Sequence, residues 1–173
     1  TGVQTCALSD LGCASIPGVS EQKKVFIAPK MSIQLPDISD LKQHFEFEQM
    51  ITATYDSQKM AFQNQISFSP EKLLMVFYDP FGRASLTIQW DKKGIEYTKS
   101  ASVPQKLLPE NILADFVMMN WPPTSIQNAL KPSGAHLIET KNHRQIVRDG
   151  KVLIDVQYAS SSKLNPLKSH IIY

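Results

Sequence analysis

The stretches HFEFEQMITATY (44–55), KMAFQNQISFSP (59–70), KLLMVFYD (72–79) and GRASLTIQWD (82–91) decide the fold. In the first, second and fourth, apolar side chains occupy alternate positions, which is typical of a strand with one buried face and one solvated face. The third is apolar on both faces, so we expect it to be covered on both sides. Because only short polar or Pro/Gly turns separate these stretches, they predict an antiparallel meander that forms a curved sheet with a dry interior.

Length and charge exclude several classes of protein. The 173 residues fit one domain, which would bury about two thirds of its surface. The formal net charge is only +2, and the lysines and arginines are scattered along the chain. We expect no nucleic-acid partner, because phosphate backbones are bound by dense basic stripes. No apolar run approaches the roughly 20 residues that a membrane-spanning helix needs.

A change of period after residue 108 predicts two helices. Pro109 suits the first turn of a helix, and the run WPP at 121–123 ends it. Between them, apolar residues recur at helical spacing. They are Ile112, Leu113, Phe116 and Val117, with Met118 and Met119 widening the apolar face. A second, short helix is expected at Ser125–Leu130, with Thr124 as its cap.

The remaining segments complete an α+β fold class. Residues 1–22, rich in Ser, Gly, Thr and Pro, predict an irregular N-terminal tether, and residues 23–173 a single domain. Residues 23–35 predict edge pairing or a lead-in loop. Further strands are expected at 135–141, 143–148, 151–159 and from residue 170 onward, with a tight turn at Asp149-Gly150. We therefore predict a curved antiparallel sheet whose concave face is covered by helices.

Catalytic motifs are missing from the sequence. It contains no Gly-x-Ser-x-Gly elbow, no His-Glu-x-x-His and no Gly-rich phosphate loop. His136 and His143 could straddle a hairpin, although surface positions at strand ends are the simpler interpretation. Glu46 and Glu48 share a strand face that alternation places on the solvated side. We expect no catalytic residue, no metal and no cofactor.

Asp115 is the one carboxylate beside the dense apolar face of the predicted helix. Three interpretations stay open: a buried polar partner, an anchor in a binding site, or a solvated helix residue. A histidine within hydrogen-bond reach of it would favour an enzyme, such as a hydrolase that acts on an acyl substrate.

Two cysteines, Cys6 and Cys13, lie close together in the polar N-terminal segment. We expect them to form a small disulfide loop, which requires an oxidising compartment. The alternatives are two free thiols or a two-ligand metal fragment, although a zinc site needs more ligands than these two.

Aromatic and methionine side chains gather on the expected concave face. Methionine adapts to irregular apolar shapes, and a curved sheet roofed by a helix can hold a lipid-sized cavity. The alternative is a fully packed core that holds no ligand. The predicted cavity lining is Phe45, Phe47, Ile51, Phe62, Ile66, Phe68, Leu86, Ile88, Trp90, Phe116, Met118 and Met119.

Three segments carry a family resemblance: DPFGR followed by SLTIQW (79–83 and 85–90), LPENILADFVMMNWP (108–122) and RDGKVLIDVQY (148–158). Over residues 31–173 the chain resembles a bacterial lipoprotein family of unknown function. The most specific pieces are Pro80 to Arg83 and the run from Ile112 to Pro122. More distantly, the arrangement is similar to the LolA and LolB lipoprotein-carrier fold, a half-open antiparallel barrel whose concave apolar face is lidded by helices.

The resemblance implies an exported protein of the Gram-negative cell envelope. It would be anchored to the outer membrane through an N-terminal lipidated cysteine, face the periplasm and bind a hydrophobic ligand such as a lipid or an acyl chain. One position departs from this pattern, because Val3 follows Thr1-Gly2 where a lipidated cysteine is expected. Either Val3 replaces that cysteine, or the anchor is Cys6 or absent.

The leading functional hypothesis is a non-enzymatic envelope lipoprotein that binds or carries a lipid, an acyl chain or the lipid of a lipoprotein. The alternative is a membrane-anchored docking module with a packed core and no ligand, whose partners are envelope transport proteins. A hydrophobic cavity favours the first hypothesis, and a filled interior with an exposed apolar patch favours the second.

Overall fold

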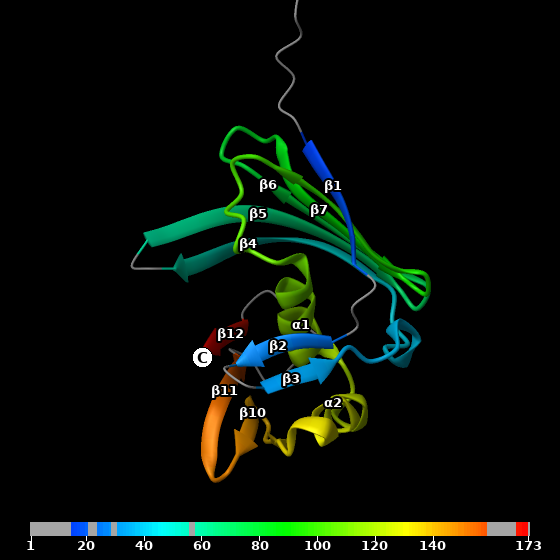
Figure 1. Cartoon of the computed structure of the whole chain (residues 1–173), viewed down its shortest axis with the longest axis vertical. Helices are drawn as coiled ribbons and strands as arrows, with labels where there is room; N and C mark the ends of the chain where they lie inside the picture. The colour runs from blue at the N-terminus through cyan, green and yellow to red at the C-terminus, as the bar shows by residue number, and fades with distance from the viewer. Residues whose placement is uncertain (1–14, 21–23, 29–30, 56–57, 159–168, 173) are drawn as a thin grey trace, which may run out of the picture.

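The computed structural model describes residues 15–20, 24–28, 31–55, 58–158 and 169–172. Its largest element is a six-stranded antiparallel sheet with the strand order β1-β8-β7-β6-β5-β4 (Figure 1). The strands are β1 (Ser15–Ser20), β4 (Phe45–Tyr55), β5 (Gln58–Ser69), β6 (Lys72–Tyr78), β7 (Ala84–Asp91) and β8 (Gly94–Ser100). The consecutive order from β4 to β8 confirms the predicted meander.

Two smaller sheets and two helices complete the described fold. Strands β2 (Lys24–Ala28) and β3 (Met31–Gln34) form a hairpin. A four-stranded sheet has the order β12-β11-β10-β9, with β9 (His136–Glu139), β10 (His143–Arg148), β11 (Lys151–Tyr158) and β12 (Ser169–Ile172). The helices are α1 (Pro109–Asn120) and α2 (Pro123–Leu130), and the short 3-10 helices are η1 (Ile38–Asp40) and η2 (Lys131–Ser133). The predicted α+β class is confirmed.

Helix α1 lies between the large curved sheet and the two smaller sheets (Figure 1). One face of the large sheet packs on it, and a single apolar cluster runs from that face through α1 to the four-stranded sheet. The ring centroids of Phe45 on β4 and Phe116 on α1 are 6.3 Å apart. On the opposite face Glu46 is exposed, as predicted, and accepts a hydrogen bond from Ser67 Oγ. The alternation read from the sequence therefore assigns the two faces of β4 correctly. Within the described residues the expected cover on both faces of β6 is not found, because Leu74 and Val76, on the same face of the sheet as Glu46, are only half-buried.

Prolines set the ends of both helices. Pro109 occupies the first turn of α1, where its missing N–H costs nothing. Trp121 precedes Pro122 and is extended, with ψ of 155°, because the following ring disfavours the helical conformation. Helix α2 begins at Pro123, so Thr124 lies inside it and is not its cap.

Two segments differ from the sequence-based expectation. Residues 15–20, which we expected within an irregular tether, form β1 and pair with β8 from Ser15↔Ser100 to Ser20↔Ile95. Strands β2 and β3 pair with each other in a two-stranded sheet of their own, in place of an edge strand or a lead-in loop. The predicted disulfide of Cys6 and Cys13 lies outside the described residues.

Candidate functional site

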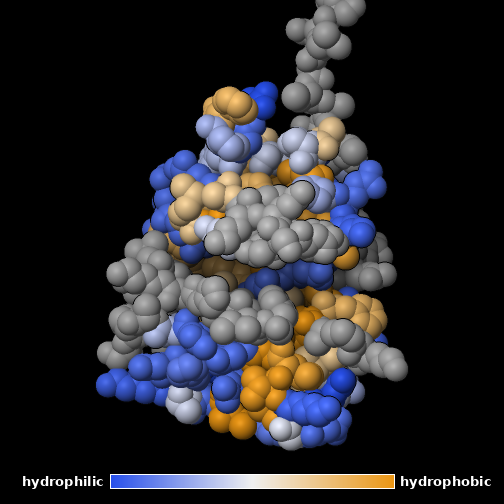
Figure 2. Space-filling model, turned by 90° about the vertical axis from the view of Figure 1, so that its left-hand side faces the viewer, coloured by the Kyte–Doolittle hydropathy of each residue, from blue (hydrophilic) through white to orange (hydrophobic). Residues whose placement is uncertain are grey.

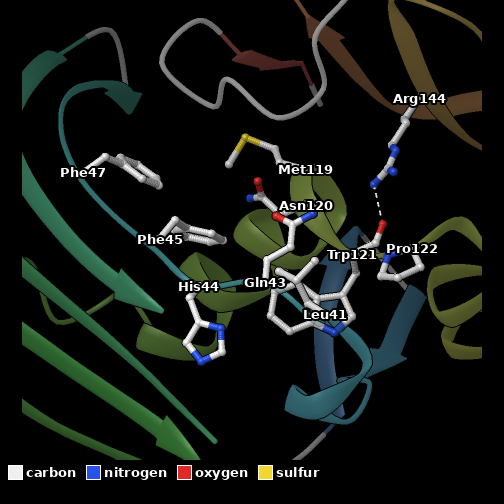
Figure 3. Close-up of a pocket in the computed structure, with 10 residues that line it drawn as sticks. All are labelled: Leu41, Gln43, His44, Phe45, Phe47, Met119, Asn120, Trp121, Pro122 and Arg144. Atoms are coloured by element: carbon white, nitrogen blue, oxygen red, sulfur yellow. Dashed lines mark hydrogen bonds between the residues drawn. The ribbon is translucent and has the colours of Figure 1, made fainter. Parts of the chain in front are cut away.

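A pocket of about 600 Å³ opens between the start of β4 and the C-terminal end of α1 (Figure 3). Strand β4 and the loop before it form one wall, and the end of α1 with one residue of β10 forms the other. The lining residues are Leu41, Gln43, His44, Phe45, Phe47, Met119, Asn120, Trp121, Pro122 and Arg144. Figure 3 shows the rings of Phe45 and Phe47 on the opposite side of the pocket from Arg144, with Met119 between them. The pocket surface is therefore mixed: aromatic rings and Met119 lie beside the polar side chains of Gln43, His44 and Asn120. Its apolar part suits hydrocarbon.

Trp121 joins the pocket to the core. Its side chain is fully buried, and its ring stacks on Trp90 with centroids 5.5 Å apart. Phe68 and Phe116 contact the same ring edge-on, at 5.6 and 6.0 Å. The indole Nε1–H donates to the backbone carbonyl of Asp37 at 3.1 Å, so the one polar atom of the side chain is satisfied. The loop before β4 is thereby fixed to the end of α1.

Arg144 on β10 caps the C-terminal end of α1. It is 5% exposed, and its Nη1 donates to the carbonyls of Met118 at 3.1 Å and Trp121 at 2.8 Å. The last carbonyls of a helix have no partner within it, and a cation is favoured near them. Nε donates to Glu139 Oε1 at 3.1 Å. Because a carboxylate and the carbonyl end of α1 surround the guanidinium, its charge is balanced within the protein, and it is a poor site for an anionic ligand.

Two further side chains satisfy carbonyls of the same helical turn. The hydroxyl of Tyr158 on β11 donates to Met119 O at 2.8 Å, and Asn120 Nδ2 donates to Phe116 O at 2.8 Å. Burial raises the pKa of the Tyr158 phenol to about 12. The pocket wall made by α1 is therefore held by side chains from two strands of the four-stranded sheet.

The twelve residues predicted to line a cavity occupy three different environments. Phe45, Phe47 and Met119 line the pocket. Ile51 and Phe62 pair across β4 and β5 further along the same face and are half-buried. The remaining seven are packed core residues: Ile66, Phe68, Leu86, Ile88, Trp90, Phe116 and Met118. The pocket thus occupies one edge of the predicted concave face, because α1 and Trp121 fill its centre.

A polar pair interrupts this apolar face next to the pocket. Gln49 and Asn64 are register partners on β4 and β5, between the Phe47–Ile66 and Ile51–Phe62 pairs. Asn64 is fully buried, and Gln49 is half-buried. Gln49 Nε2 donates to Asn64 Oδ1 at 3.3 Å, and Asn64 Nδ2 donates to Val76 O at 3.2 Å. Sequence reasoning missed this pair, although polar residues at two inward positions of the alternation could have revealed it.

His136 and His143, which the sequence suggested could straddle a hairpin, do not form a common site. His136 pairs with Val147, whereas His143 pairs with Gln157 on the other neighbour of β10, so the two histidines lie at opposite ends of β10. His143 Nδ1 lies 3.2 Å from Asp155 Oδ1. The Gln157 amide and then this histidine lower the pKa of Asp155. Within the described residues, no group of three or more His, Cys, Asp or Glu side chains could hold a metal ion.

Of the three carboxylates considered from the sequence, Asp115 is half-buried on α1. It lies four residues before Met119 and therefore on the same face of the helix. Glu48 is exposed on the solvated face of β4, where it accepts a hydrogen bond from Gln63 Nε2 at 3.3 Å. Glu48 therefore has the solvated position that alternation predicts.

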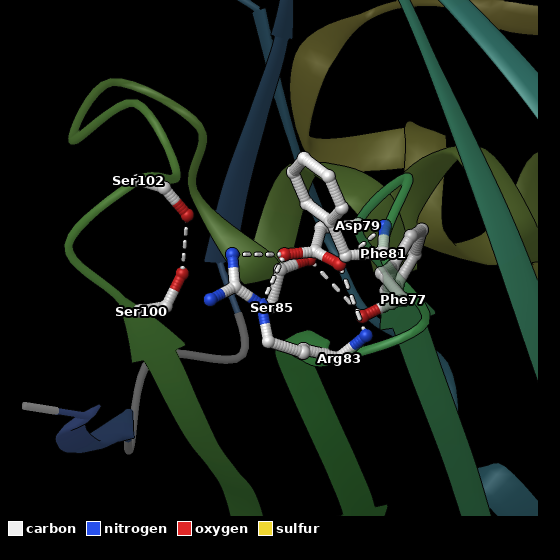
Figure 4. Close-up of polar contacts among 7 residues, drawn as sticks. All are labelled: Phe77, Asp79, Phe81, Arg83, Ser85, Ser100 and Ser102. Carbon is white, nitrogen blue, oxygen red and sulfur yellow. Dashed lines mark hydrogen bonds and ion pairs between the residues drawn. The ribbon is translucent and has the colours of Figure 1, made fainter. Parts of the chain in front are cut away.

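The turn between β6 and β7 is a second ordered polar cluster (Figure 4). Asp79 accepts hydrogen bonds from the backbone N–H groups of Phe81 and Arg83 and from the Arg83 guanidinium. The Arg83 backbone hydrogen bond is the main cause of the lowered pKa of Asp79. Phe81 is 82% exposed, with the Arg83 guanidinium 5.4 Å from its ring centroid. Ser85 Oγ donates to Phe77 O at 3.1 Å beside the bulge that follows this turn. The DPFGR motif thus builds a rigid turn.

The fold and pocket define an α+β protein with a large antiparallel sheet and a partly apolar pocket at the end of helix α1. The chain belongs to the family described as Protein of unknown function (DUF3261), whose model matches residues 46–172. No curated protein matches the chain. None of the helices in the described residues is long and apolar enough to cross a membrane.

Proposed function

We propose that the protein is a non-enzymatic module that binds or carries a lipid or another acyl chain in the pocket between β4 and α1. The pocket itself carries this proposal: about 600 Å³ of space bordered by the half-buried rings of Phe45 and Phe47 and by Met119. Partly exposed aromatic and methionine side chains around an open space favour an apolar ligand, because covering them removes apolar surface from water.

The cellular setting belongs to the same proposal. We propose a lipoprotein of the Gram-negative outer membrane that faces the periplasm, with a fold related to the half-open barrel of LolA and LolB. The support is the sequence resemblance together with a curved antiparallel sheet whose inner face packs on a helix. The hydrophobic ligand would then be an acyl chain or the lipid of a lipoprotein.

The test measures binding of the neutral apolar dye N-phenyl-1-naphthylamine, together with native mass spectrometry of protein purified from a bacterial periplasm. Phe47→Glu places a carboxylate in the pocket and should abolish dye binding and remove any co-purifying acyl species. The matched control is Met50→Glu, because Met50 lies on the opposite face of the same strand and is 69% exposed. Circular dichroism and urea midpoints establish that both variants fold. Equal dye binding by both folded variants would contradict the proposal.

A second candidate function is a docking module for envelope transport proteins. It is favoured by the packed centre of the large sheet and by exposed apolar side chains on the four-stranded sheet. Ile138 is 43% exposed and Val152 is 51% exposed. Figure 2 shows apolar side chains gathered at the end of the molecule opposite the large sheet. A ligand-free mass after exposure to envelope lipids, with no dye binding by the wild type, would favour this function.

A further inference from the structure

An unusual group follows the pocket residue Phe47 along β4: the polar pair of Gln49 and Asn64 on an otherwise apolar sheet face. The inner positions of β4 and β5 around this pair hold only apolar side chains: Phe45, Phe47 and Ile51 on β4, and Phe62, Ile66 and Phe68 on β5. The next inner position across from Asn64 is Phe77 on β6, which is 6% exposed. Among these inner positions of β4 and β5, the pair is therefore the one polar site in an apolar surface.

The pair also has hydrogen-bonding capacity that its known contacts do not use. A glutamine side chain offers two N–H donors and a carbonyl acceptor. Gln49 uses one donor, to Asn64 Oδ1, and within the described residues neither its second N–H nor its Oε1 has a partner. Buried or half-buried polar groups are usually satisfied, because leaving them unpaired costs free energy. Either water or a group on a ligand can satisfy the rest of the Gln49 amide.

The position of Gln49 suits a group on a pocket ligand. Phe47 lines the pocket, and Gln49 follows two residues later on the same face, about 6.6 Å further along the strand. A chain that lies over Phe45 and Phe47 and continues along β4 reaches the Gln49 amide next. Past it, Ile51 and Phe62 restore an apolar surface.

The charges around the pocket disfavour an ionised group at this point. The cation Arg144 lies at the other side of the pocket, is bonded to Glu139 and caps α1. On α1, Asp115 shares the half-buried face of Met119. His44 also lines the pocket, immediately before β4 and five residues before Gln49. An anionic group next to Gln49 would therefore lose its hydration without gaining Arg144 as a partner.

We propose that the pocket selects amphiphiles that carry an uncharged group able both to donate and to accept a hydrogen bond, a hydroxyl or an amide, which Gln49 recognises. The inference rests on the proposed function, since it names the class of acyl ligand that the pocket takes. Asn64 holds the Gln49 amide in place and is a positioning residue.

The test is displacement of N-phenyl-1-naphthylamine by four probes with the same chain: 1-dodecanol, dodecanamide, 1-methoxydodecane and dodecanoate. The wild type should release the dye at about tenfold lower concentrations of the alcohol and the amide than of the ether, which cannot donate to Oε1. Dodecanoate should be weaker than the alcohol. Whichever of the alcohol and the amide displaces the dye at the lower concentration carries the group that fits Gln49 better.

Variants assign this preference to one side chain. In Gln49→Leu, the alcohol and the ether should displace the dye at about the same concentration. If the leucine variant does not fold, Gln49→Met is used in its place. The matched control is Gln63→Leu, because Gln63 is exposed on the solvated face of β5 and should leave the ratio unchanged.

Three outcomes would overturn the inference. Equal displacement by the three neutral probes would mean that water alone satisfies Gln49, while the proposed lipid-binding function would stand. A preference that persists in Gln49→Leu would place the recognition elsewhere. Failure of every probe to displace the dye would refute the proposed function together with the inference.

Discussion

Replacing Arg144 with methionine should destabilise the protein by about 3 kcal/mol. The change leaves the carbonyls of Met118 and Trp121 without their donor, and each unpaired buried acceptor costs about 1–3 kcal/mol. It also removes the cation from Glu139, whose side chain is 18% exposed and can regain part of its hydration. The methionine side chain restores some apolar contact, so the total stays below the full sum of these costs.

Urea unfolding followed by tryptophan fluorescence measures this effect, because Trp90 and Trp121 are both buried and stacked on each other. The control is Arg148→Met on the same strand, where Arg148 lies 3.9 Å from the 90% exposed Asp149. Surface ion pairs contribute about 0–1 kcal/mol. Because the Arg148 side chain is 26% exposed and has a further interaction, this variant should lose somewhat more than the pair alone, but clearly less than Arg144→Met. A loss below about 1 kcal/mol for Arg144→Met, or equal losses for the two variants, would refute the assignment of Arg144 as the cap of α1.

Two further predictions concern the same region. Trp121→Phe removes the hydrogen bond to Asp37 O and leaves a small void. In the same urea assay this variant should lose about 2 kcal/mol of unfolding free energy. A loss under about 0.5 kcal/mol would contradict the role given to the indole. Burial raises the pKa of Tyr158 above its unfolded value of 10.0 to about 12. The contribution of Tyr158 to the free energy of unfolding is therefore fully present below pH 10 and is lost as the pH rises toward 12. Between pH 10 and pH 12 the free energy of unfolding of the wild type should fall by about 1–2 kcal/mol more than that of Tyr158→Phe. If the free energies of unfolding of the two proteins ran parallel over this pH range, the prediction would be wrong.

Much of the fold follows from local rules in the sequence. Pro109 and the WPP run fix α1 because proline is tolerated at the start of a helix and disfavours a helical residue before it. The Asp149-Gly150 turn was predicted correctly, and both residues have positive φ, 52° and 73°, as a two-residue hairpin turn requires.

Strand β1 was missed for a physical reason. Its sequence SIPGVS shows no alternation, and its place in the sheet depends on backbone pairing with β8. A Cβ at Gly18 would overlap the ring of its register partner Tyr97, so the strand needs glycine where the neighbouring ring lies. Such complementarity between residues about 80 positions apart has no local pattern.

The candidate site was predicted in part. Alternation indicated the apolar side chains of Phe45 and Phe47, but it could not show that Trp121 and Phe116 fill the centre of the concave face, because packing depends on the relative position of helix and sheet. Arg144 carried a readable signal. It occupies the same face of β10 as Ile146, and a charge at an inward strand position indicates a buried partner.

The pocket is built from two walls of unequal stiffness. On the α1 side, Arg144 and Tyr158 fasten the last helical turn to the four-stranded sheet. On the other side, β4 is the edge strand of the large sheet and is paired only with β5 within the described residues. Backbone amides at a sheet edge open with little free energy, whereas those in an anchored helix exchange only when larger units unfold. The pocket should therefore widen when the β4–β5 pairing opens locally. A bound acyl chain should slow amide hydrogen exchange in β4 and leave that of α1 nearly unchanged.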